Sequence, residues 1–153
     1  MRARATTRYN EAVAIERGPL VYALRIGEEW TRVNADKPHR ELPHGDFEVR
    51  PTTPWNYGLI VDPGRVEQDA RFEERPVGDR PFSPDGAGVM AHARGRQVPN
   101  WKIVRGWAAE WSPADVAWSD PGRAVTDRPV EDVVLIPYGC TNIRITEFPR
   151  LKE

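Results

Sequence analysis

The chain has 153 residues, which is enough for a single domain, residues 1–153, that buries a hydrophobic core. Its 22 basic and 23 acidic residues nearly cancel, so no long-range field attracts nucleic acid or an anionic membrane, and neither is expected as a partner. The single cysteine, Cys140, excludes an internal disulfide and a cysteine-based zinc site, while 15 prolines and 12 glycines favour short strands over helices.

The first segment, residues 1–11, is expected to be an N-terminal tail. It lacks the apolar run of a secretory leader, which favours a cytoplasmic location by default. No window of the chain approaches the roughly 20 apolar residues that span a bilayer.

Residues 13–26 give the clearest strand pattern. Val13 and Ile15 lead into a Gly-Pro turn, after which one face of an extended segment is apolar: Leu20, Tyr22, Leu24 and Ile26. The opposite face carries Val21 and Ala23. An apolar strand on both faces is typical of a central position in a sheet.

The middle of the chain predicts two more extended regions followed by a long loop. Phe47 and Val49 begin the first, and residues 55–61 place Trp55, Tyr57, Leu59 and Val61 on one face. Residues 62–88 are rich in proline, glycine and charge, and are expected to form a long loop with one strand near residues 71–77. Loops of that length in compact domains usually cover or bind something.

The last part predicts strands at residues 89–93 and 101–104, and then a hairpin. Residues 130–138 and 142–148 are the expected hairpin strands, joined by a turn at Gly139. With about eight to ten short strands, the chain is expected to be all-β, an antiparallel β-sandwich of jelly-roll-like form. At most one or two short helical turns are expected, one of them at residues 106–113.

No cluster in the sequence has the spacing of a metal or cofactor site, and none is predicted. His39 and His44 flank Pro43, which prevents helical ligand spacing and favours a solvated turn. His92 lies alone in a strand-like run, as hydrogen-bonded sheet histidines do. Cys140 has no nearby group in sequence that would strongly activate a thiol, so it is interpreted as structural.

A carboxylate pair is the remaining route to catalysis, because acid/base chemistry on a sugar needs two carboxyl groups facing across it. The candidates are Glu110, Asp115, Glu131 and Asp132. Charged residues beside strands are usually solvated, so a small enzyme is the least favoured alternative and no catalytic residue is assigned.

The six tryptophans, at positions 30, 55, 101, 107, 111 and 118, are the best candidates for a binding surface. Each indole buries a large area and is therefore expected in the core. Trp55 and Trp101 are the better candidates for exposure, because each opens a strand beside a proline-containing loop. With Tyr57 they define the predicted carbohydrate-binding surface, on which sugar rings would stack.

Four segments together resemble a known family: residues 16–22 (ERGPLVY), 50–57 (RPTTPWNY), 135–141 (LIPYGCT) and 144–149 (RITEFP). The set is similar to the C-terminal β-sandwich region of glycoside hydrolase family 127, the β-L-arabinofuranosidase-like proteins. The resemblance extends over about residues 12–150.

In that family an upstream (α/α)6 barrel performs catalysis, with a zinc-bound cysteine as nucleophile and a glutamate as acid/base. The zinc site uses several cysteines, including an adjacent pair, whereas this chain has only Cys140. The resemblance therefore implies a non-catalytic accessory domain whose partner is the catalytic barrel. The domain would support that barrel or help a homodimer form. A carbohydrate-binding module that uses Trp55, Tyr57 and Trp101 is the alternative.

A domain that packs on a barrel is expected to expose an unusually large apolar patch. Residues 18–22 are the expected edge of that patch.

Overall fold

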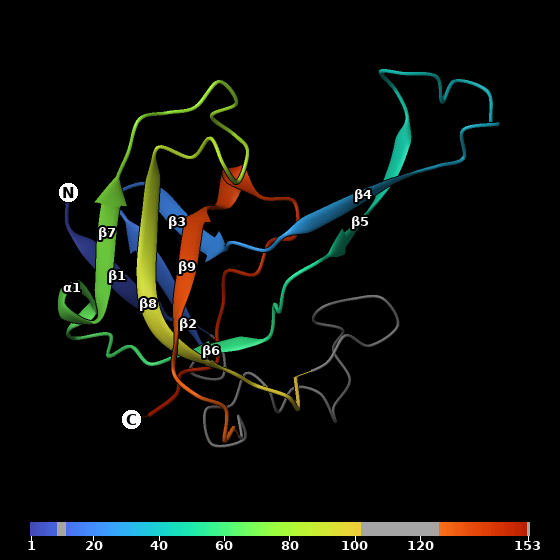
Figure 1. Ribbon diagram of the computed structural model, residues 1–153. Helices are drawn as coiled ribbons and strands as arrows, with labels where there is room; N and C mark the ends of the chain where they lie inside the picture. The colour runs from blue at the N-terminus through green and yellow to red at the C-terminus, as the bar shows by residue number, and fades with distance from the viewer. Residues whose placement is uncertain (9–11, 102–125, 153) are drawn as a thin grey trace.

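The computed structural model describes residues 1–8, 12–101 and 126–152. Within these residues the elements are strands β1 (Ala3–Thr7), β2 (Val13–Arg17), β3 (Leu20–Leu24), β4 (Glu28–Val33), β5 (Asp46–Pro51) and β6 (Tyr57–Leu59), helix α1 (Val66–Asp69), strands β7 (Ala70–Glu74), β8 (Val89–Gln97) and β9 (Glu131–Pro137), and the 3-10 helix η3 (Tyr138–Cys140). The prediction of an all-β, antiparallel fold with only short helical turns is confirmed (Figure 1).

One curled sheet forms the body of the molecule. Its strands follow the order β1-β2-β3-β9-β8-β6. β7 also pairs with β8, on the edge that β6 uses but at the opposite end of the strand. Every pair of named strands is antiparallel. The nine residues of β8 are long enough to hold β7 against Val89–Ala93 and β6 against Gly95–Gln97.

Residues 148–151, which we call the seam, join the two ends of this curl. Val13 and Phe148 exchange backbone hydrogen bonds of 2.8 and 3.0 Å, which attaches the seam to β2. The Leu59 N–H donates to the Pro149 carbonyl at 2.9 Å, and the Leu151 N–H donates to the Leu59 carbonyl at 2.8 Å. The sheet therefore closes on itself. Its two halves face each other as the two layers of the fold.

The core lies inside this curl. Its largest fully buried side chains include Trp101, Tyr22, Phe148, Ile15, Leu59 and Leu135. Tyr22 on β3 meets Phe72 on β7 edge to face, with ring centroids 5.6 Å apart, although two strands separate β3 from β7 within the sheet. This contact across the interior is what a curled sheet requires. Burial of these aromatic and branched side chains is the main stabilising contribution.

The N-terminal segment is not a tail. Ala3 and Ala5 are buried while Arg4 points outward and pairs with Glu16, so a period-two pattern with very small apolar side chains produces β1. The Ala3 N–H also donates to Glu67 on α1. Residues 62–88 likewise contain α1 and β7, the latter close to the predicted strand at residues 71–77.

The predicted C-terminal hairpin is wrong. β9 pairs with β3 and β8 instead of with residues 142–148. These residues bond to β3 through the Ile145 carbonyl, which accepts the Leu24 N–H, and to β2 through Phe148. The hairpin does not form because β3 and β8 occupy both edges of β9, while the Glu28 carboxylate accepts the N–H groups of Asn142 and Ile143.

The central position predicted for residues 20–24 is confirmed, because β3 pairs with both β2 and β9. Of residues 18–22, the expected edge of an exposed patch, Tyr22 is buried, Leu20 and Val21 are half-buried, and Gly18 and Pro19 are exposed. The predictions for residues 102–104 and 106–113 lie outside the described residues.

Candidate functional site

A two-stranded ribbon, β4 and β5 with the connecting loop, projects away from the curled sheet (Figure 1). We call residues 28–51 the arm. Its register places Trp30, Arg32, Phe47 and Val49 on one face, and Glu29, Thr31, Glu48 and Arg50 on the other. The arm is therefore amphipathic although neither of its faces lies in the core of the body.

A hollow of about 570 Å3, which we call the groove, lies at the base of the arm. Side chains from the end of β3, the arm, the segment before β6, the loop before β8 and the start of β9 line it: Leu24, Arg25, Ile26, Gly27, Glu28, Trp30, Thr53, Pro54, Tyr57, Pro84, Asp85, Asp132, Val133 and Val134. It is open to solvent and combines aromatic, aliphatic and charged groups.

Trp30 forms the wall on the arm side. Its side chain is 51% exposed, yet its orientation is fixed at two points. The indole Nε1 donates to Glu28 Oε2 at 3.2 Å, and the ring meets Phe47 edge to face at 6.0 Å. The exposed indole ring of Trp30 therefore has a fixed orientation at the edge of the groove.

Glu28 anchors the arm to the body. Oε1 accepts hydrogen bonds from the Thr141 hydroxyl and from the backbone N–H groups of Asn142 and Ile143, and Oε2 accepts from the Asn142 side-chain amide. Burial alone would raise the pKa of this carboxyl, but these donors outweigh burial and hold the pKa below its ordinary value. Glu28 is therefore an ionised structural acceptor.

Tyr57 is the second aromatic residue of the groove lining. Its hydroxyl donates to Glu131 Oε2 at 2.7 Å, which fixes the ring. Burial, the hydrogen bond to Glu131 and the negative charge of that carboxylate together raise the pKa of Tyr57 to about 12. The phenol therefore stays protonated at neutral pH.

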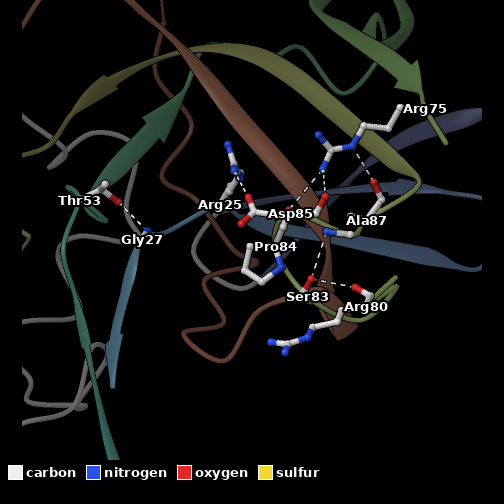
Figure 2. A network of polar contacts seen from close by, with 10 residues as sticks. Arg25, Gly27, Thr53, Arg75, Arg80, Ser83, Pro84, Asp85 and Ala87 are labelled. Atoms are coloured by element: carbon white, nitrogen blue, oxygen red, sulfur yellow. Dashed lines mark hydrogen bonds and ion pairs between the residues drawn. The ribbon is translucent and has the colours of Figure 1, made fainter. Parts of the chain in front are cut away.

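The loop before β8 supplies the third wall, and Figure 2 shows what holds it. Arg75 donates from Nε to the Ala87 carbonyl at 2.7 Å and from Nη2 to the Asp85 carbonyl at 3.1 Å. Arg25, which follows β3, donates to the Asp85 side chain at 2.6 Å. The Ser83 hydroxyl adds a bond to the Arg80 carbonyl. Two arginines thus fix the position of an exposed Asp85 at the rim of the groove.

Asp132, at the start of β9, brings a histidine to the edge of the groove. Its Oδ2 lies 2.7 Å from Nδ1 of His92 on β8, and His92 Nε2 lies 3.6 Å from Glu73 on β7. The predicted role of His92 as a hydrogen-bonded sheet residue agrees with the bond to Asp132. Among the described residues, the buried Nε2 atom has no hydrogen-bond partner.

The carboxylates proposed for catalysis are occupied by these contacts. Glu131 accepts the Tyr57 hydroxyl and Asp132 pairs with His92, while Glu110 and Asp115 lie outside the described residues.

Of the three predicted carbohydrate-binding residues, only Tyr57 lines the groove. Trp101 is 2% exposed and belongs to the core, so its prediction as a stacking surface is wrong. It packs edge to face against the half-buried Trp55 at 5.0 Å, and the Asn56 side chain donates to its carbonyl. The start of a strand beside a proline loop therefore does not ensure exposure.

Trp30 was missed as a site residue. The available signal was period two: Trp30 alternates with charged and polar neighbours and shares a face with Phe47 and Val49 across the ribbon. Trp107, Trp111 and Trp118 lie outside the described residues.

The remaining candidates lie apart from the groove lining. His39 and His44 are exposed in the loop of the arm, and no group of three metal-ligating side chains occurs within residues 1–8, 12–101 and 126–152. Cys140 is buried, which raises the pKa of its thiol and lowers its reactivity. In the same part of the chain, no helix has the length and apolar character needed to cross a membrane.

The segments on which the family resemblance rests lie in separate parts of the fold. Residues 16–22 form the β2–β3 turn, residues 50–57 connect the arm to β6, and residues 135–141 continue β9 into η3. Comparisons with models of protein families, with curated proteins and with solved structures find no match for this chain. The relationship to glycoside hydrolase family 127 is therefore a proposal.

Proposed function

We propose that this chain is a non-catalytic accessory domain of a glycoside hydrolase family 127-like enzyme, which packs beside the catalytic (α/α)6 barrel and supports it. The observation that carries this proposal is the arm. Trp30, Leu42 and Phe47 on it are 51%, 65% and 43% exposed. Contiguous exposed apolar side chains on a soluble domain mark surfaces that bind another protein.

Packing within the arm does not explain its exposed apolar side chains. A two-stranded ribbon without a packed face is marginally stable in water. Near its tip, Leu42 and Phe47 both lie close to Gly45, where the missing side chain leaves room for them. An apolar cluster so far from the core gains burial only against a partner.

The resemblance supports the choice of partner. Residues 50–57 place the arm on the body: the Thr52 N–H donates to the Gly27 carbonyl at 2.8 Å, and the Gly27 N–H donates to the Thr53 hydroxyl at 2.9 Å. The sequence similar to the family thus includes the base that sets the direction of the arm. A catalytic barrel beside this domain is the partner that the family relationship implies.

The test is binding to a barrel encoded by the same genome, with a paired-cysteine zinc site as its signature. We expect the two purified proteins to form a one-to-one complex in size-exclusion chromatography with light scattering. Replacing both Leu42→Ser and Phe47→Ser should weaken the complex at least about tenfold, which is 1.4 kcal/mol.

The matched control is Phe82→Ser, because Phe82 is 81% exposed and lies outside the arm. It should leave binding unchanged, with circular dichroism confirming that all variants fold. Separate elution of barrel and domain, or equal binding by the arm variant and the control, contradicts the proposal. So does a stable homodimer that forms through the arm and excludes the barrel.

A further inference from the structure

We propose that the groove at the base of the arm binds a short neutral saccharide. Trp30 and Tyr57 are the stacking surfaces, and Asp85, Asp132 and Arg25 are the groups that hydrogen-bond to sugar hydroxyls. This site differs from the surface predicted from sequence, because Trp101 is in the core and Trp30 takes its place. Trp30 belongs to both the arm and the groove, so the saccharide test uses this chain alone, whereas docking is tested through Leu42 and Phe47.

The aromatic walls suit the apolar faces of sugar rings. An aromatic ring has a negative face, which attracts the weakly positive C–H groups of a sugar. Trp30 and Tyr57 are both held by hydrogen bonds, to Glu28 and to Glu131, at 3.2 and 2.7 Å. Both rings are therefore already immobilised before a ligand stacks on them, which lowers the entropic cost of binding.

The polar groups suit hydroxyls, each of which both donates and accepts. Arg25 and Asp85 form a pair at 2.6 Å, and the Asp85 side chain is 88% exposed. Such a pair offers a donor and an acceptor side by side, as two neighbouring hydroxyls require. Asp132 adds a second exposed carboxylate from β9.

The charges of the groove disfavour an anionic ligand. The described charged residues of the lining are Arg25, Glu28, Asp85 and Asp132, so acidic groups are in excess. An anionic sugar would meet repulsion, since the guanidinium of Arg25 is already paired with Asp85. A cationic ligand would be attracted by the same excess of acidic groups, so a polyamine is included in the test as the competing ligand class.

The size is also appropriate. The groove has a volume of about 570 Å3, within the range of about 300–1,000 Å3 typical of small-molecule sites. Its open form leaves room for a chain of sugar units to enter and leave, which a closed cavity would not.

The test is isothermal titration calorimetry of the whole chain with neutral arabino-, xylo- and cello-oligosaccharides, with an oligogalacturonate and with spermine. We expect saturable binding of at least one neutral oligosaccharide with a millimolar or lower Kd. Trp30→Ala and Tyr57→Ala should each weaken it at least about tenfold. Tyr57→Phe should retain binding, since its hydroxyl is directed to Glu131.

Phe82→Ala is the control, because it removes an exposed aromatic ring that does not line the groove. It should bind like the unchanged chain. The proposal is overturned if no neutral oligosaccharide saturates the chain, if oligogalacturonate or spermine binds more tightly, or if Trp30→Ala binds as well as the control. Amide chemical shifts of each variant verify that the sheet is intact.

Discussion

At the scale of single residues, Glu28 connects the arm, Trp30 and the segment after η3. Its two oxygens receive donors from Trp30 and from Thr141, Asn142 and Ile143. One side chain thereby fixes both the orientation of a groove wall and the course of the chain towards the seam.

We expect Glu28→Gln to lower the free energy of unfolding by about 1–3 kcal/mol, the usual effect of losing charged hydrogen bonds. The new amide NH2 would face the donors of Asn142 or Trp30 and leave them unpaired. Urea unfolding at neutral pH measures this change. Glu29→Gln, at the neighbouring exposed position on the opposite face of the ribbon, should change stability by less than about 0.5 kcal/mol.

The same pair of variants tests the ionisation of Glu28. Because the folded-state pKa lies below the ordinary 4.5, the carboxylate stabilises the fold above that pH, and this contribution is lost as pH falls through the folded pKa. The stability difference between the unchanged chain and Glu28→Gln should therefore shrink below pH 4.5. A difference that is constant with pH would contradict the assignment.

Sequence predicts burial of individual residues only where the pattern is strong. Tyr22 and Leu24 were correctly placed inside, because apolar residues occupy both faces of their segment. Trp101 and Trp30 were not, because the burial of a tryptophan depends on which remote elements reach it. Trp101 is covered by Trp55 and Asn56, which lie far away in sequence.

At the scale of elements, β8 depends on a glycine where it passes between β6 and β9. A Cβ on Gly95 would lie 2.6 Å from the Gly58 carbonyl oxygen and 2.6 Å from Val133. Real Cβ atoms do not approach so closely, so the strands would have to separate. The close approach that lets one strand pair with β6, β7 and β9 thus requires this residue.

We expect Gly95→Ala to destabilise the fold by about 1–3 kcal/mol through overpacking. The measurement is the midpoint of urea unfolding at constant m-value. Gly139→Ala is the control, because the nearest side chain, Phe82, lies 4.0 Å from the added Cβ. If Gly95→Ala were as stable as Gly139→Ala, the packing around β8 would be looser than described.

Elements with a regular apolar period were predictable, whereas their partners were not. The sequence predicts the strands β2, β3, β8 and β9, since alternation or an apolar run marks each. The predicted hairpin after Gly139 does not form because β3 and β8, which are distant in sequence, occupy both edges of β9. The arm was recognised only in part, from Phe47 and Val49.

At the scale of the whole molecule, the seam joins the first and last parts of the described chain. Phe148 is fully buried there and exchanges two backbone hydrogen bonds with Val13. Its ring fills the interior between the ends of the curl. Closure of the sheet therefore depends on one aromatic side chain more than on local strand preferences.

We expect Phe148→Ala to cost about 3–5 kcal/mol, as deletion of a buried aromatic side chain does. This is a large share of the about 5–15 kcal/mol that stabilises an ordinary domain. Phe82→Ala, at a position 81% exposed, should change the free energy of unfolding by less than about 0.5 kcal/mol. Guanidinium unfolding measures both, and equal effects would show that the seam does not hold the sheet closed.

The seam has a consequence for biosynthesis. A ribosome must release residues 148–151 before Val13 and Leu59 meet their partners, so the open edges of β2 and β6 persist while residues 60–147 are translated. Unpaired edges of this kind recruit strands from other nascent chains. Contacts between such distant residues also slow folding. Newly made molecules are therefore at greatest risk of aggregation until residues 148–151 have left the ribosome.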